Sequence, residues 1–184
     1  LDFVSVPWPV VASNAIVTTY IPGCIAGTEE GFEGVAPGAG NYPSGWSNGG
    51  GTQQWQSRTG STSSGGTGPN AASEGSDYFY CETSSPAIAG DTYIMTSPSI
   101  SGGSAVRFDL SRVGTTIGTL DVSVDDGTGA QSIGNYTGPG TSEWSTELLV
   151  LPAGLGANYT VTFTYMRGSS FTGDLAIDAF CIMQ

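Results

Sequence analysis

The sequence predicts an all-β sandwich with long loops rich in glycine and serine, and three observations predict it. Of the 184 residues, 29 are Gly, 23 are Ser and 21 are Thr, a composition poor in helix-forming side chains. Short segments that alternate apolar and polar residues recur between turn residues in the second half of the chain. No segment of ten or more residues has the spacing of an amphipathic helix. With 38% hydrophobic residues, the chain is long enough for one domain with a core.

The chain opens with its most hydrophobic stretch, residues 1–23, which contains one charged residue and three prolines. Every second residue over residues 4–10 is apolar, which is strand spacing. The prolines in this segment lack an amide donor, so the strand belongs at a sheet edge, either of its own sandwich or, as a donor strand, of a neighbouring copy. We therefore divide the chain into an N-terminal arm, residues 1–23, and a sandwich domain, residues 24–184. The arm residues expected to make contacts are Leu1, Phe3, Val4, Val6, Trp8, Val10 and Ile16.

Residues 34–77 are expected to form long loops with one short strand around Trp55, because glycine, serine, asparagine and proline dominate this stretch. Over residues 159–165 every second side chain is aromatic or apolar and alternates with threonine, so the apolar set should point inward. Asp125-Asp126-Gly127 predicts a turn. Further strands are expected at residues 78–82, 93–95, 105–110, 119–124, 147–151, 158–166 and 174–182.

The charged-residue composition excludes several classes of function. The chain has no His and no Lys, and four Arg against 16 Asp and Glu give a net charge of −12. Without an imidazole or an amine, Ser-His-Asp, Cys-His, Schiff-base and phosphate-loop mechanisms are unavailable, and we expect no enzymatic activity. Four scattered arginines make no phosphate-binding patch, and no apolar run reaches the roughly 20 residues that span a bilayer. Neither nucleic-acid binding nor membrane insertion is expected.

A composition that favours Ser, Thr, Gly and acidic residues over Lys, together with two sequons, favours a secreted protein at the cell surface or in the extracellular space. Glycosylation sequons are present at Asn135 and Asn158. The chain also has three cysteines, Cys24, Cys81 and Cys181, which allow one disulfide in three ways with one thiol left over. Their spacing matches no metal site.

A series of short motifs runs from about residue 31 to residue 182. In order, they are Phe32-Glu33, Trp55, Thr67-Gly68-Pro69, the aromatic segment 78–84, Ser97-Pro98, the segments 106–108 and 118–122, Trp144, and the segment 173–178. Together they resemble the MAM domain family of extracellular adhesion modules and the related adhesin-type jelly rolls of bacterial surface proteins. The resemblance implies a jelly-roll sandwich of two antiparallel sheets that works in adhesion or self-association without catalysis.

The resemblance also implies candidate sites. Family members often hold a calcium ion between an opening Glu, acids of the long loop and a closing Asp. Glu33 and Asp178 match this pattern here, so a structural calcium is the one cofactor considered. In jelly rolls the first and last strands usually neighbour each other, which favours a disulfide between Cys24 and Cys181 over one between Cys81 and Cys181. Other tryptophans coincide with core positions of the family, which leaves Trp46 as the candidate platform for stacking on a sugar.

Our leading sequence-based hypothesis is a non-enzymatic structural subunit that assembles head-to-tail into an extracellular or surface filament. The apolar arm, residues 1–23, motivates it, because such a segment needs a partner surface and a contact that does not close produces a fibril. The partners would be copies of the same chain. The alternative is a MAM-like cell-adhesion or carbohydrate-binding module that acts as a monomer or dimer, with glycans as partners.

Overall fold

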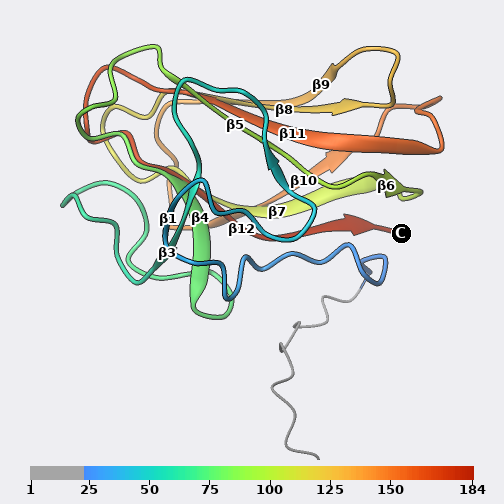
Figure 1. Cartoon of the computed structure of the whole chain (residues 1–184), viewed down its shortest axis with the longest axis horizontal. Coiled ribbons are helices and arrows are strands. Elements are labelled where there is room, and N and C mark those ends of the chain that lie inside the picture. The colour runs from blue at the N-terminus through green and yellow to red at the C-terminus, as the bar shows by residue number, and fades with distance from the viewer. Residues whose placement is uncertain (1–22) are drawn as a thin grey trace, which may run out of the picture.

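The computed structural model describes residues 23–184 and consists of strands and loops (Figure 1). No helix in this part of the chain is long and apolar enough to cross a membrane. The strands are β1 (Gly38–Ala39), β2 (Ser47–Asn48), β3 (Gln56–Thr59), β4 (Asp77–Cys81), β5 (Thr92–Thr96), β6 (Ile100–Ser101), β7 (Ala105–Ser111), β8 (Thr119–Asp125), β9 (Gln131–Thr137), β10 (Ser145–Val150), β11 (Asn158–Met166) and β12 (Leu175–Met183).

The strands form two antiparallel sheets that pack face to face (Figure 1). The first sheet has the order β1-β3-β4-β12-β7-β10, and the second has the order β2-β5-β11-β8-β9, with β6 paired to β11. Neighbours in both sheets come from distant parts of the chain, as when β12 lies between β4 and β7. The predicted all-β jelly-roll sandwich is confirmed.

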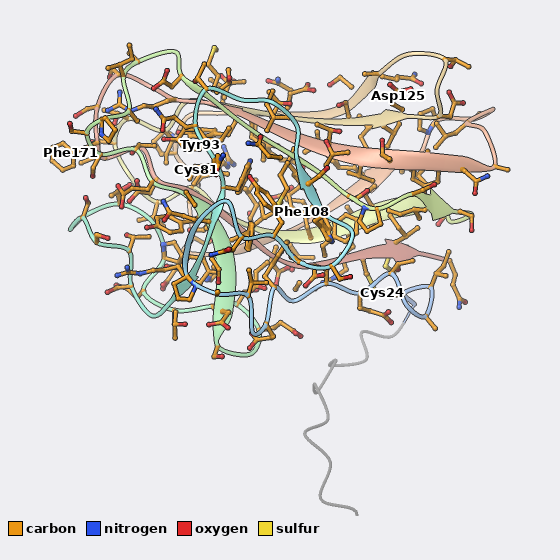
Figure 2. The ribbon with its side chains drawn as sticks, viewed as in Figure 1. Cys24, Cys81, Tyr93, Phe108, Asp125 and Phe171 are labelled. Atoms are coloured by element: carbon orange, nitrogen blue, oxygen red, sulfur yellow. A yellow bond between two sulfur atoms is a disulfide. The ribbon has the colours of Figure 1, made fainter. Side chains whose placement is uncertain are left out.

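The core fills the space between the sheets and follows the predicted alternation. On β11 the side chains of Tyr159, Val161, Phe163 and Tyr165 are all buried, while the threonines between them are partly exposed. β8 repeats the pattern with its leucine and valines inward. Phe108 of β7 lies in the middle of the sandwich (Figure 2) and meets Phe163 edge to face, with ring centroids 5.1 Å apart. Contacts of this kind across the two sheets hold the layers together.

Trp46 belongs to this core, so the prediction that it is a sugar-stacking platform was wrong. Its side chain is 7% exposed and lies among three phenylalanines. The ring centroids of Phe180, Phe32 and Phe163 are 5.1, 5.7 and 6.4 Å from that of Trp46. The physical reason is that the loop before β2 folds inward, which places the indole between the sheets and buries its faces.

The strands that the sequence did not predict are short or lie at sheet edges. β9 is the last strand of the second sheet, and all of its residues are exposed or only partly buried, so the strand shows no alternation of buried apolar side chains. β1, β2 and β6 have two residues each. The turn predicted at Asp125-Asp126-Gly127 connects β8 to β9, and Gly127 has the positive φ of 92° that a glycine permits.

The first and last described residues, Gly23 and Gln184, lie next to each other. Residues 24–30 run antiparallel to β12, with Ile25 N–H donating to the Ile182 carbonyl at 2.7 Å and Gln184 N–H donating to the Gly23 carbonyl at 2.8 Å. Next to these bonds Cys24 and Cys181 form a disulfide, which is the pairing that the family resemblance implied. The third cysteine, Cys81, is a buried free thiol.

The contact residues proposed for the N-terminal arm, Leu1, Phe3, Val4, Val6, Trp8, Val10 and Ile16, lie outside the described residues. The boundary between an arm and a sandwich domain at residues 23 and 24 stays a prediction.

Candidate functional site

The candidate site starts from the segment that carries the chain from one sheet to the other. After β2, Gly49 N–H donates to the Ile94 carbonyl and Gln53 N–H to the Thr92 carbonyl, so the segment follows β5 of the second sheet. It then enters β3 of the first sheet at Gln56. Gly51 permits this path, because a Cβ there would fall 2.5 Å from the Thr92 carbonyl oxygen. The crossing segment, residues 49–56, thus forms one wall at the end of the sandwich.

Asp91 fixes this wall through its two carboxylate oxygens. Oδ1 accepts from the Thr52 hydroxyl at 3.0 Å, and Oδ2 accepts from the Gln53 side-chain amide at 3.0 Å and from Ile88 N–H at 2.9 Å. The bond from Ile88 and the side-chain bonds from Gln53 and Thr52 lower the pKa of Asp91. The ionised carboxylate therefore joins the crossing segment to the loop before β5.

The opposite wall is the first part of this same loop, residues 82–86, which follows β4. Its Glu82 carboxylate accepts from Ser84 N–H at 2.9 Å and from the Tyr80 hydroxyl at 3.3 Å. Burial, and then the negative charge of Glu82, raise the pKa of Tyr80 to about 12. Beneath both walls, the buried Tyr93 of β5 donates its hydroxyl hydrogen bond to the Glu82 carbonyl. Figure 2 shows Tyr93 within the body of the sandwich.

Between the walls lies an open cleft of about 340 Å³. Most of its lining residues carry a polar group, Ala39 and Pro86 being the apolar ones, and the lining contains a single carboxylate, that of Glu82. Among the described residues, the side-chain amides of Gln54 and Gln56 have no hydrogen-bond partner, so they are free to bond a ligand. The lining residues are Ala39, Thr52, Gln53, Gln54, Gln56, Glu82, Ser84, Ser85, Pro86 and Tyr93.

An exposed aromatic residue lies on the loop next to this cleft. Phe171 is 50% exposed, and its carbonyl accepts from the Thr83 hydroxyl at 2.9 Å, one residue before the lining Ser84. Figure 2 shows the Phe171 ring projecting away from the ribbon. It is the one aromatic residue among the large hydrophobic side chains that the described part of the chain exposes. Neither Phe171 nor the cleft was predicted from the sequence.

The two proposed calcium ligands have other roles in the structure. Asp178 is buried and accepts from Ser73 N–H, Glu74 N–H, Ala179 N–H and the Ser73 hydroxyl. Glu33 accepts from Ser76 N–H, Asp77 N–H and the Ser76 hydroxyl. Both carboxylates thus hold the loop before β4, and their oxygens are used by amide and hydroxyl donors.

The residues around this pair do not fit calcium. Within residues 23–184, no three Asp, Glu, Cys or His side chains come together as a metal site would require. The family resemblance implies a further acid at the position that Ala72 occupies here. The structure therefore corrects the proposed role of Glu33 and Asp178, because a cation would have to displace the donors that they already bind.

The two sequons lie on exposed strand positions. Asn135 is on β9 and Asn158 is the first residue of β11, and both side chains are exposed. An attached glycan would thus meet solvent at either residue, and glycosylation remains a prediction.

A buried carboxylate predicts how stability depends on pH. Asp174 is fully buried, with Oδ1 accepting from Thr83 N–H and the Thr83 hydroxyl, and Oδ2 without a partner among the described residues. Burial raises the pKa of Asp174 to about 6. The folded state binds this proton more tightly than the unfolded state does, so protonation of Asp174 stabilises the folded state. This contribution to the free energy of unfolding is complete below about pH 4 and is lost as the pH rises through about 6.

We therefore expect Asp174 to lower the free energy of unfolding by about 2–3 kcal/mol between pH 4 and pH 7. Urea unfolding of the natural chain and of Asp174→Asn at several pH values measures this contribution. The variant should have the smaller decrease across this interval. Equal pH dependence in the two proteins would contradict the role given to Asp174.

Comparison with known families agrees with this architecture. The model for the MAM domain, meprin/A5/mu, matches residues 39–184. The chain belongs to the MAM domain family. The matched residues include all strands of both sheets except the first residue of β1, and they include every lining residue of the cleft.

Solved structures similar to this MAM domain are adhesin and carbohydrate-binding modules. A cleaved adhesin domain of Lys-gingipain has a TM-score of 0.64 at 18% identity, covering 85% of this chain and 97% of that one. A second cleaved adhesin domain, from Porphyromonas gingivalis, has a TM-score of 0.57 at 15% identity, with 83% and 94% covered. TmCBM61, solved with beta-1,4-galactotriose, has a TM-score of 0.51 at 14% identity, with 77% and 89% covered. These likenesses show that the fold is shared.

Proposed function

We propose that this MAM domain is a non-catalytic adhesion module of the extracellular space or cell surface that binds neutral glycans in the cleft. The observation that carries the proposal is the pair of side-chain amides, Gln54 and Gln56, that line a preformed cleft without a partner among the described residues. Family membership and the likeness to a module solved with an oligosaccharide support the same function.

The chemistry of the lining suits sugar hydroxyl groups. An amide both donates and accepts hydrogen bonds, so the unpartnered amides of Gln54 and Gln56 match the alternating hydroxyls of a pyranose. Phe171 on the neighbouring loop supplies an apolar face of the kind that stacks on a sugar ring. The net charge of −12 opposes sialylated or sulfated glycans, which favours uncharged ones.

The same lining favours binding over hydrolysis. Glycoside hydrolysis normally requires two carboxyl groups at a defined separation across the scissile bond. The cleft has one carboxylate, Glu82, and its oxygens already accept from Ser84 N–H and the Tyr80 hydroxyl. A bound oligosaccharide would therefore be released unchanged.

The filament hypothesis depends on residues 1–23 and receives no support from the described sandwich. The extracellular location is supported by family membership, by the Cys24–Cys181 disulfide and by exposed sequons at Asn135 and Asn158. We retain the location and favour the adhesion module over the structural polymer.

Glycan binding predicts a selective effect of two substitutions in the cleft. We expect Gln54→Ala combined with Gln56→Ala to weaken binding of a neutral oligosaccharide at least about 10-fold, because each lost hydrogen bond is worth about 1 kcal/mol. A glycan array identifies the oligosaccharide, and isothermal titration calorimetry measures its dissociation constant. Melting temperatures should stay unchanged, since neither amide bonds another described residue.

Gln131→Ala provides the matched control, because Gln131 is an exposed glutamine on β9, at the edge of the other sheet. It should bind with the same dissociation constant as the natural chain. Binding that the double variant retains at full strength would exclude the cleft, and a natural chain that binds no neutral glycan on the array would refute the proposed function.

A further inference from the structure

The outer face of β10 exposes two large apolar side chains. Leu148 is 59% exposed and Val150 is 74% exposed, and they are two residues apart on the same face. Leu149 between them points to the opposite side and packs against the core. β10 is the last strand of its sheet, so this apolar pair lies at an edge where no described strand continues the sheet.

The backbone of β10 is available at the same two residues. Leu151 N–H donates to the Ser104 carbonyl of the chain leading into β7. Because backbone groups alternate sides along a strand, odd-numbered residues of β10 bond β7 and even-numbered residues direct their N–H and C=O to the open edge. Leu148 and Val150 thus offer backbone hydrogen bonds and apolar side chains to one incoming strand.

The sequence of the N-terminal arm has the complementary pattern. Its apolar residues, Val4, Val6, Trp8 and Val10, occupy even positions, and its prolines, Pro7 and Pro9, occupy odd positions. In a strand paired through its even residues, the missing proline donors would face away from β10, where none is needed. Residues directly opposite in a ladder share a face, so the even valines and Trp8 would cover Leu148 and Val150.

We propose that residues 4–10 add to the open edge of β10 in the same chain and close this edge of the sheet. This inference is independent of the proposed glycan function, because β10 and the cleft strand β1 lie at opposite ends of the first sheet's strand order.

The chain is long enough to make this connection within one molecule. The segment 24–30, β12, β7 and β10 are successive neighbours, so the described chain starts about three strand spacings, roughly 14 Å, from the edge of β10. Residues 11–22 reach up to about 40 Å when extended. A tethered strand also has an effective concentration in the millimolar range, which favours pairing within one chain over pairing between chains.

A face of small and apolar side chains leads from that starting point to the edge. Met183, Ala105 and Val150 are directly opposite one another across β12, β7 and β10, so they share the outer face. A Cβ on Gly23 would fall 2.8 Å from Met183 Cε, which places the start of the described chain at the other end of this row. Ala105 in the middle of this row is buried, Met183 is partly exposed and Val150 is exposed, and the arm that would follow the row has a single charged residue, Asp2.

Hydrogen exchange of the full-length chain tests the proposal at the amides of Leu148 and Val150. We expect both to exchange at least about 10-fold more slowly than unprotected amides, although no described group accepts from them. Val6→Pro removes an N–H that faces β10 in the proposed pairing, and should abolish this protection. Ser5→Pro removes an N–H from the side of the existing prolines, and should preserve it.

The two proline variants are matched, because both restrict the preceding residue to an extended conformation. Both substitutions fall outside the described residues 23–184, and unchanged far-ultraviolet circular dichroism of the two variants will show that the sandwich is folded. Rapid exchange of Leu148 and Val150 in the natural chain, or equal protection in the two variants, would overturn the proposal.

Light scattering after size exclusion identifies the occupant of the edge. A monomeric mass over a 100-fold range of concentration (on the order of micromolar to hundreds of micromolar), together with the protection pattern above, supports pairing within one chain. Protection that appears only together with dimers or longer oligomers would overturn it, and would assign the edge to a second copy of the chain.

Discussion

Trp46→Ala is expected to lower the free energy of unfolding by about 3–5 kcal/mol, as large-to-small substitutions of buried aromatic residues do. Trp46 is 7% exposed and contacts the rings of Phe32, Phe163 and Phe180, which come from three separate parts of the chain. Removal of the indole therefore leaves a cavity between the sheets that no single element can fill. Urea unfolding followed by far-ultraviolet circular dichroism measures the loss.

Phe171→Ala is the control for this prediction. Phe171 is 50% exposed, so its truncation should change stability by no more than about 0.5 kcal/mol. A Trp46→Ala variant as stable as the Phe171→Ala variant would contradict the core position of Trp46 and would restore it as a surface platform.

The second large effect is expected from removal of the disulfide. The double variant Cys24→Ser, Cys181→Ser should lose about 2–5 kcal/mol, because the bond joins residues 157 positions apart and restricts the unfolded chain. The two cysteines are replaced together so that no new thiol can pair with Cys81. Denaturant unfolding of the natural and double-variant proteins under non-reducing conditions measures the difference.

Thiol counting provides the accompanying check on this prediction. The natural protein should react with one equivalent of a thiol reagent, and only after unfolding, because burial raises the pKa of the Cys81 thiol well above its ordinary value. Three reactive thiols in the unfolded natural chain would show that the disulfide is absent.

The sheets were predictable where one face of a strand is buried and the other is not. On β11 the alternation of large apolar residues with threonines determined both the strand and its inward face, because the period of two is a direct result of the pleat. β9 has no such contrast between its faces, and nothing in its residues distinguishes it from a loop. It is a strand because β8 provides hydrogen-bond partners along its length.

The candidate site was less predictable, because the cleft exists only after distant segments meet. The crossing segment at residues 49–56 and the loop after β4 are brought together by Asp91 and Tyr93, and local sequence does not encode that meeting. A usable signal was the series Gln53-Gln54-Trp55-Gln56, in which a buried tryptophan is flanked by glutamines. Trp46 was misassigned for the related reason that a loop rich in glycine gives no indication of which side chains turn inward.

The position of the disulfide has a mechanical consequence for the proposed adhesion module. Gly23 and Gln184 are hydrogen-bonded to each other, and the Cys24–Cys181 bond lies directly beside this pair. If tension is applied through the chain on either side of the sandwich, it passes from residue 24 to residue 181 across a covalent bond. The strands between those residues then lie outside the load path, so the cleft would keep its shape while the tether is under strain.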